Sequence, residues 1–165
     1  MRRVDRQMDE AFALDVMDRC EFAVLSMVGE EGTPYSVPLS IAREDKHLYF
    51  HCALQGKKSD ILRHNPAVCV VCVSGVKPAP MEFSTEYESA IATGRAVEVT
   101  GEEEKIHALR LICQRYAAEN MAAFDGAIAR SLARTGIWRV EMEQITGKRK
   151  KYGADGKELK FGRRE

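Results

Sequence analysis

The residues of this chain best suited to bind a ligand are two lysines that follow a glycine, Lys57 and Lys58 after Gly56. Residues 48–53 read as a strand, and residues 57–64 read as a short helix that ends before an Asn-Pro pair. The start of a helix presents unpaired backbone N–H groups and the positive end of the helix dipole, so it favours an anion. Two ammonium groups at the same place predict a phosphate site; the alternative is a solvated turn.

Size and composition indicate one globular domain. The chain has 165 residues, 45% hydrophobic and 30% charged, which is enough to bury a core. Acidic and basic residues number 25 each, so the net charge of zero gives no reason to expect nucleic acid or an anionic membrane as partner. No apolar run reaches the roughly 18 residues of a membrane span, and residues 1–5 lack the apolar core of a signal peptide. We therefore expect a cytoplasmic protein.

The five cysteines do not predict a metal site. Cys69 and Cys72 have the spacing of a ligand pair, but they lie in the β-branched run 67–73. Residues three apart on a strand face opposite sides, so the two thiols cannot share a metal ion. No second Cys/His pair has zinc spacing, and we expect reduced, structural thiols.

The remaining pattern consists of strands, short turns and inserted helices. Pro38 places its strand at an edge or a bulge, Gly94 marks a bulge, and Thr100 is a candidate helix cap. The run 76–80, with two prolines, is expected to be a loop. Helices are expected at 9–19, 57–64, 100–118 and 121–133, and strands at 22–28, 35–41, 47–52, 67–75, 82–99 and 137–142.

Hairpin-length turns between most strands predict an antiparallel β-barrel in a mainly β chain with inserted helices (α+β). Neither a Gly-x-Gly-x-x-Gly turn nor a P-loop occurs, which argues against a dinucleotide-binding or P-loop fold. From about residue 147 the chain turns charged, and the basic run 148–151 suggests a solvated tail. We therefore divide the chain into a barrel domain, 1–147, and a basic C-terminal tail, 148–165.

The order of several short motifs resembles a known family. They are Gly-Thr-Pro-Tyr-Ser-Val-Pro-Leu at 32–39, the strand at 48–53 with Gly56-Lys-Lys, Asn-Pro-Ala-Val at 65–68, Phe83-x₃-Tyr-Glu-Ser89-x₄-Gly-Arg-Ala96, and Glu-Glu-Lys at 103–105. This series resembles the nitroimidazole-resistance branch of the pyridoxamine 5′-phosphate oxidase-like flavoproteins over residues 1–148. The resemblance implies a split β-barrel homodimer that binds FMN at the subunit interface.

The resemblance also implies a set of flavin contacts. The phosphate positions of the family match Lys57, which we favour for direct contact, and Lys58. The strand that borders the flavin ring matches Val37, Pro38, Leu39 and Ser40, and the neighbouring strand carries His51 and Cys52. Ser89 matches a polar contact that is glutamine in the oxidase branch, and the candidates from the partner subunit are Trp138 and Arg139. His51 could donate a hydrogen bond or a proton to a reduced substrate. His51 and Lys58 could equally be a packed and a solvated side chain, and Trp138 a core residue.

The C-terminal segment departs from the oxidase branch. Residues 148–165 contain no Arg-x-His pair of the kind that the true oxidase uses, so vitamin B6 oxidation is not expected. We predict that the protein passes electrons from NAD(P)H to a small acceptor such as a nitro-aromatic or quinone-like compound, with flavin as the redox group. Two alternatives are a flavin- or haem-binding protein without turnover, with His51, His64 or His107 as haem ligands, and an empty barrel that serves as an interaction module.

Overall fold

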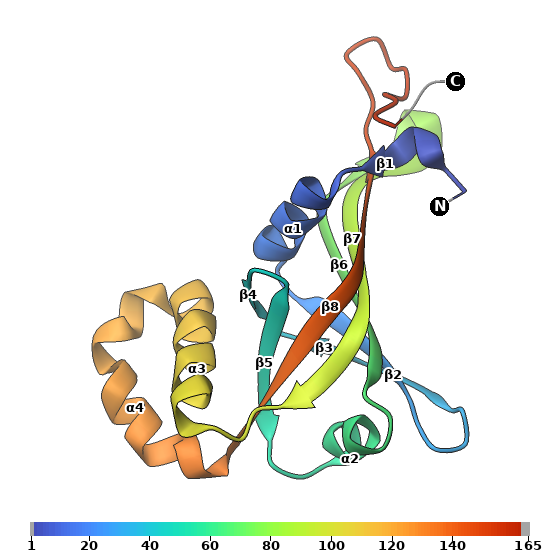
Figure 1. Ribbon diagram of the computed structural model, residues 1–165. Helices are drawn as coiled ribbons and strands as arrows, with labels where there is room; N and C mark the ends of the chain where they lie inside the picture. The colour runs from blue at the N-terminus through green and yellow to red at the C-terminus, as the bar shows by residue number, and fades with distance from the viewer. Residues whose placement is uncertain (1, 163–165) are drawn as a thin grey trace.

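The computed structural model describes residues 2–162 and consists of one antiparallel sheet with four α-helices (Figure 1). The strands are β1 (Gln7–Met8), β2 (Ala23–Val28), β3 (Pro34–Leu39), β4 (Ala42–Glu44), β5 (His47–Ala53), β6 (Ala67–Ala79), β7 (Ser84–Glu98) and β8 (Thr135–Lys150). The helices are α1 (Glu10–Arg19), α2 (Lys57–His64), α3 (Glu102–Tyr116) and α4 (Phe124–Ser131).

The strands pair in the order β3-β2-β6-β7-β8-β5-β4, and β1 adds to β8. The sheet coils into a barrel, but its end strands β3 and β4 do not pair with each other within residues 2–162. The barrel is therefore split along one side, as the sequence predicted. Pro38 lies in β3 at this open edge, where an N–H group is not needed for pairing.

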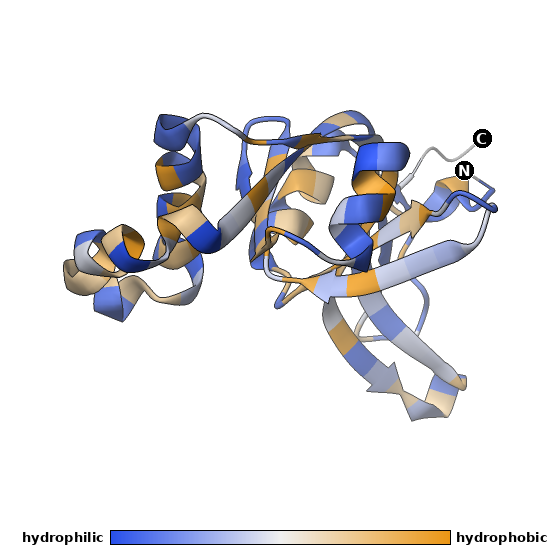
Figure 2. Ribbon diagram, turned by 90° about the horizontal axis from the view of Figure 1, so that it is seen from below, coloured by the Kyte–Doolittle hydropathy of each residue, from blue (hydrophilic) through white to orange (hydrophobic). Residues whose placement is uncertain are grey.

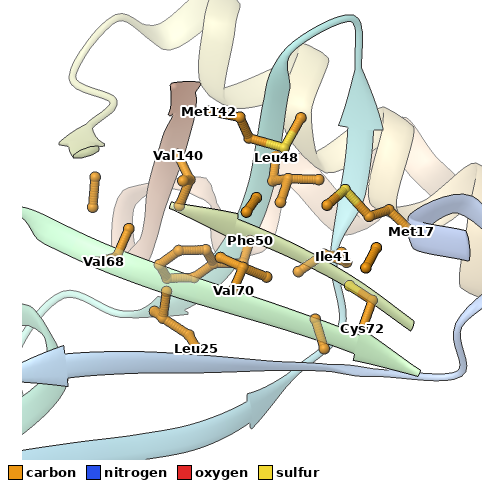
Figure 3. Close-up of a cluster of buried hydrophobic side chains, with 14 of the residues drawn as sticks. Met17, Leu25, Ile41, Leu48, Phe50, Val68, Val70, Cys72, Val140 and Met142 are labelled. Carbon is orange, nitrogen blue, oxygen red and sulfur yellow. The ribbon is translucent and has the colours of Figure 1, made fainter. Parts of the chain in front are cut away.

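Alternating side chains of the strands form the barrel core. In β2 the buried residues alternate with half-buried ones, and Phe50 of β5 packs against Leu25 and Val70 inside the barrel (Figure 3). Burying a side chain of this size contributes about 1.5–3 kcal/mol. Buried and exposed residues alternate along β7 from Ala90 to Ala96, as a strand with one buried face requires.

Helices cover the barrel at three places. The carboxylate of Asp9 caps α1 by accepting a hydrogen bond from Phe12 N at 2.8 Å. The apolar face of α1 packs into the core through Val16 and Met17. α2 lies where β5 ends and β6 begins (Figure 1). α3 and α4 stand to one side and pack through a second cluster on Tyr49 and Ile137 (Figures 1 and 2).

One prediction on the long strands was wrong and another is confirmed. Residues 76–79, expected in a loop, continue β6 beyond an irregularity between Ser74 and Lys77. There β6 pairs with β7 alone, so Pro78 tolerates its missing N–H group at a free edge. The bulge predicted at Gly94 is confirmed, because the register shifts there and a side chain would overlap the Glu141 carbonyl.

The C-terminal part of the barrel also differs from the prediction. β8 extends from Thr135 to Lys150 because its second half pairs with β7, so the boundary placed after residue 147 falls inside a strand. The basic residues 148–150 are half-buried rather than solvated. Residues 163–165 of the proposed tail, and residue 1, lie outside the described residues. Thr100 does not cap α3, which follows Gly101 without a side-chain cap.

Candidate functional site

The start of α2 has the backbone geometry of an anion site. Gly56 precedes the helix with φ of +136°, a conformation that side chains rarely adopt, and no side chain caps the helix. The first hydrogen bond of the helix runs from Asp60 N to Gly56 O at 3.1 Å. The N–H groups of residues 57–59 therefore have no acceptor within the helix and can bind an anion.

The two lysines flank this helix start without a carboxylate partner. Lys57 Nζ lies 4.5 Å from the centre of the Tyr35 ring, and Lys58 Nζ lies 5.1 Å from that of Phe50. Within residues 2–162, the ion pairs of α2 involve Arg63 and His64 instead. Burial lowers the pKa of Lys58, since the loss of water around the ammonium group disfavours its charged form.

Side chains from the end of β5 border the lysines. Cys52 Sγ lies 3.7 Å from Ser59 Oγ, and Ser59 is a buried polar residue, 2% exposed. His51 is at the surface on the opposite face of β5. Partial burial of its ring, followed by repulsion from Lys58, lowers the pKa of His51, so the imidazole is neutral near pH 7. The structure thus brings His51 and Cys52 near Lys58, whereas Lys57 lies over Tyr35.

Strand β3 runs from this cluster along the open edge of the barrel. Val37 and Leu39 pack against the core, whereas Pro38 and Ser40 are exposed, Ser40 lying just beyond the strand. Tyr35, whose ring Lys57 covers, is three residues before Pro38, which corresponds to about 10 Å along a strand. One elongated ligand can therefore contact both the ammonium group of Lys57 and the free backbone groups at the edge of β3.

An apolar hollow of about 910 Å³ lies on the outer face of β2 and β6. Val24 and Val71 form its floor, and Phe22, Val73 and Val76 are 53%, 44% and 61% exposed. Sequence reasoning missed this hollow, although the uninterrupted apolar runs of both strands are typical of strands covered on both faces. An apolar sheet face of this size indicates a binding surface.

The predicted residues Pro38 and Ser89 lie on either side of this hollow. Pro38 pairs with Val24 across β3 and β2, and Ser89 pairs with Val73 across β7 and β6. Their strands are three steps apart in the sheet, or about 14 Å at ~4.8 Å a step. Ser89 is, however, far from Cys52: their β8 partners, Lys148 and Gly136, are separated by about 40 Å of strand.

Trp138 and Arg139 lie elsewhere. Trp138 is 2% exposed in the barrel core, where it pairs with Phe50. Arg139 points to the α3 side and forms ion pairs with Glu104 at 2.5 Å and Glu141 at 2.7 Å. Trp138 thus lies beside the Phe50 ring that Lys58 covers, whereas Arg139 is held by carboxylates on the α3 side.

The three histidines considered as haem ligands are at separate places. His64 Nδ1 lies 3.4 Å from Glu30 and His107 Nε2 lies 2.9 Å from Glu44, whereas His51 borders Lys58. Among residues 2–162 no group of three His, Cys, Asp or Glu side chains could hold a metal ion. In the same part of the chain, no helix has the length and apolar character needed to cross a membrane.

A split antiparallel barrel with a cationic helix start beside its open edge defines a class of cofactor-binding β-barrels. Residues 9–149 match the family model described as pyridoxamine 5′-phosphate oxidase, and the chain belongs to this family. No curated protein matches the chain in sequence.

Solved structures show the same architecture. A candidate 5-nitroimidazole antibiotic resistance protein from Bacteroides thetaiotaomicron is 27% identical, with 86% of this chain and 85% of that one covered and a TM-score of 0.75. An FAD and heme binding protein from Mycobacterium smegmatis is 20% identical, with 87% and 73% covered and a TM-score of 0.75. An FAD-binding protein from Mesorhizobium loti is 22% identical, with 87% and 96% covered and a TM-score of 0.61. The last two share the fold with this chain.

Proposed function

We propose that the protein is a cytoplasmic FMN-dependent reductase that passes electrons from NAD(P)H to a small acceptor such as a nitro-aromatic. The observation that carries this proposal is the uncapped start of α2 with two lysines that have no carboxylate partner among residues 2–162. Membership of the family, and relatives that are described as FAD-binding or as a nitroimidazole resistance protein, favour a flavin and this class of acceptor.

The residues present fit FMN in three respects. Lys57, Lys58 and the free N–H groups of α2 suit the phosphate, and β3 offers unpaired backbone groups to the polar edge of the flavin ring. The separation of about 10 Å along β3 between Tyr35 and Pro38 allows both contacts with one molecule. When bound, flavin supplies the redox chemistry, and the protein supplies its position and its hydrogen bonds.

The apolar hollow supports the proposal of a homodimer with FMN at the interface. Phe22, Val73 and Ile91, which is 42% exposed, leave the outer sheet face apolar, and a second copy would cover it. Ser89 on this face would then contact the flavin whose phosphate is held by the α2 lysines of the other copy. In this arrangement, Ser89 of one copy and Cys52 of the other lie near the same flavin, although within one chain they are separated by about 40 Å along β8.

His51 is the proposed hydrogen-bond donor to the acceptor. Its lowered pKa keeps the imidazole neutral near pH 7, and a neutral imidazole has one N–H group to donate. It lies at the surface beside Lys58, where a small acceptor can approach. His51→Ala should lower kcat with a smaller effect on FMN affinity, and His51→Gln should retain most of kcat, because the amide keeps a hydrogen-bond donor.

The test begins with the chromophore of the purified protein. The ligand released by denaturation is compared with FMN, FAD and haem, and the apoprotein is then titrated with FMN by flavin fluorescence. Oxidation of NADPH with a nitro-aromatic acceptor is followed by absorbance. Released FMN and NADPH turnover support the proposal; a colourless protein that does not bind added FMN overturns it and favours the interaction module.

A second candidate is a flavin- or haem-binding protein without turnover, favoured by the shared fold with the FAD and heme binding protein. It predicts bound chromophore but no oxidation of NADPH with any acceptor. A Soret band in the released ligand, rather than flavin absorbance, would identify haem.

A further inference from the structure

The two end strands of the sheet, β3 and β4, are joined in the chain by Ser40 and Ile41, which cross the open side of the barrel. The Ile41 side chain is 2% exposed and packs in the barrel core (Figure 3). Its backbone groups take no part in the sheet, because the residue lies between the two strands. The N–H and C=O groups of this buried residue therefore need partners from elsewhere in the molecule.

Two adjacent side chains at the end of α3 are these partners. The Ile41 N–H group donates to the Tyr116 hydroxyl at 3.2 Å, and the Ile41 carbonyl accepts from Arg115 at 2.9 Å. A second nitrogen of the same guanidinium donates to the Cys20 carbonyl at 2.5 Å. Both backbone groups of one buried residue are thus held by residues 74 and 75 positions further along the chain.

The two carbonyls that Arg115 contacts lie at the same end of the β2–β3 pair. Leu39, the last residue of β3, pairs with Ala23, the first residue of β2. Ile41 comes shortly after Leu39, and Cys20 comes shortly before Ala23. The planar guanidinium therefore bridges the two segments at the ends of these strands, and within residues 2–162 it forms no ion pair with a carboxylate.

The helix that carries these side chains is itself held by the barrel. α3 lies beside β5 and β4 (Figure 1), and its Leu109 and Ile112 belong to the second core cluster with Tyr49. His107 Nε2 on the same helix lies 2.9 Å from Glu44 of β4. A packed helix of this kind can hold a neighbouring chain segment in one position.

We propose that Arg115 and Tyr116 are positioning residues of the flavin site, an inference that rests on the proposed function. The link that they hold comes directly after residues 37–40, the strand end proposed to contact the polar edge of the flavin ring. Neither side chain has to touch the ligand, because each acts by fixing the backbone of Ile41 and so the direction in which β3 ends. A change at the end of α3 should alter the hydrogen bonds to the ring and leave the phosphate contacts at α2 unchanged.

The first test is independent of flavin and measures hydrogen exchange in the full chain without ligand. Tyr116→Phe removes the acceptor of the Ile41 N–H group, so the Ile41 amide should exchange at least about tenfold faster than in the wild type. The matched control is Arg110→Gln on the same helix, since Arg110 pairs with Asp125 of α4 at 3.1 Å. It should leave exchange at Ile41 unchanged. Equal exchange in Tyr116→Phe and the wild type overturns the proposal.

The second test compares FMN with riboflavin, which has the same ring but no phosphate. Arg115→Gln should raise Kd by about tenfold for both ligands, because it acts on the ring end of the site. Tyr116→Phe, which removes a single oxygen atom, should raise both by about threefold and serves if Arg115→Gln does not fold. The α2 variant Lys57→Ala, Lys58→Ala should weaken FMN alone. A loss confined to FMN in the α3 variants, or no loss for either ligand, overturns the positioning role.

Arg115→Lys separates position from charge. An ammonium group keeps the charge but cannot reach two carbonyls as the planar guanidinium does, so it should recover only a minor part of the lost affinity. Full recovery would show that charge rather than position is responsible, and would overturn the proposal. A wild type that binds neither flavin contradicts the proposed function, and this inference falls with it. A wild type that binds both, with α3 variants that match it, contradicts this inference alone.

Discussion

The chain contains two clusters of basic residues that look alike in the sequence and differ in their surroundings. The α2 lysines, Lys57 and Lys58, lie over aromatic rings without a carboxylate partner in the described residues. In the β8 cluster, residues 148–150, Arg149 pairs with Glu88 at 3.1 Å. Lys148 and Lys150 lie over the rings of Tyr87 and Tyr152, so among these three residues the carboxylate partner belongs to Arg149. Glu88 also pairs with Arg19 at 2.9 Å.

The difference indicates different roles. A charge with a fixed carboxylate partner contributes to the fold, whereas a charge without one at a helix start is available to an external anion. Arg149 therefore holds β7 against the C-terminal strand through Glu88, and the α2 lysines are the proposed place for a phosphate. The following experiments test this contrast.

The largest effect is expected from the double variant Lys57→Ala, Lys58→Ala. Loss of two charge-assisted hydrogen bonds should weaken FMN binding by about 3 kcal/mol, roughly 100-fold in Kd. The measurement is a fluorescence titration of the apoprotein with FMN. The matched control, Lys148→Ala with Lys150→Ala, should change Kd by less than about twofold. Equal losses of FMN affinity in the two double variants would contradict the different roles of the two clusters.

A smaller effect is expected on stability from the other cluster. Glu88→Gln leaves Arg149 and Arg19 without their shared carboxylate and should lower the free energy of unfolding by about 1 kcal/mol. Urea denaturation followed by circular dichroism gives this value. Lys57→Ala should change it by less than about 0.5 kcal/mol, because an exposed lysine without an ion pair contributes little. A larger loss for Lys57→Ala would show that it is structural.

The C-terminal end of the molecule should also be sensitive to acid. A hydrogen bond from Arg6 lowers the pKa of Glu158 from its ordinary value to about 2. Since the folded state favours the carboxylate, its contribution is complete above about pH 4.5 and is lost as the pH falls toward 2. Thermal unfolding between these pH values should show the decline, and Glu158→Gln should flatten it, with a change of about 2 °C. An unchanged pH profile in Glu158→Gln would contradict this assignment.

The smallest effect concerns the contact between His51 and Lys58. Repulsion from Lys58 is the second cause, after burial, of the lowered pKa of His51. Lys58→Ala should therefore move this pKa upward, toward its ordinary value, in an NMR titration of the imidazole. Lys57→Ala is the control and should leave the pKa of His51 unchanged, because Lys57 lies over Tyr35 instead. A shift in both variants would place His51 nearer the helix start than its contacts indicate.

Helix bounds, the bulge and the edge strand were predicted correctly where single residues of the chain signal them. The bounds of α2 follow from Gly56 before it and the Asn-Pro pair after it, and Asp9 marks the start of α1. The bulge at Gly94 and the edge position of Pro38 also follow from one residue each. The lengths of β6 and β8 could not be predicted this way, because Pro78 and Lys148 are tolerated only through the strands beside them.

The sequence by itself determined the split barrel, the family and the cationic helix start, since these depend on periodicity, turn residues and motif order along the chain. Only the tertiary structure decided which basic residues have carboxylate partners, and that Pro38 and Ser89 lie on either side of one apolar hollow. These are contacts between segments far apart in the chain. Their energies arise from burial and charge pairing that no single stretch of residues contains.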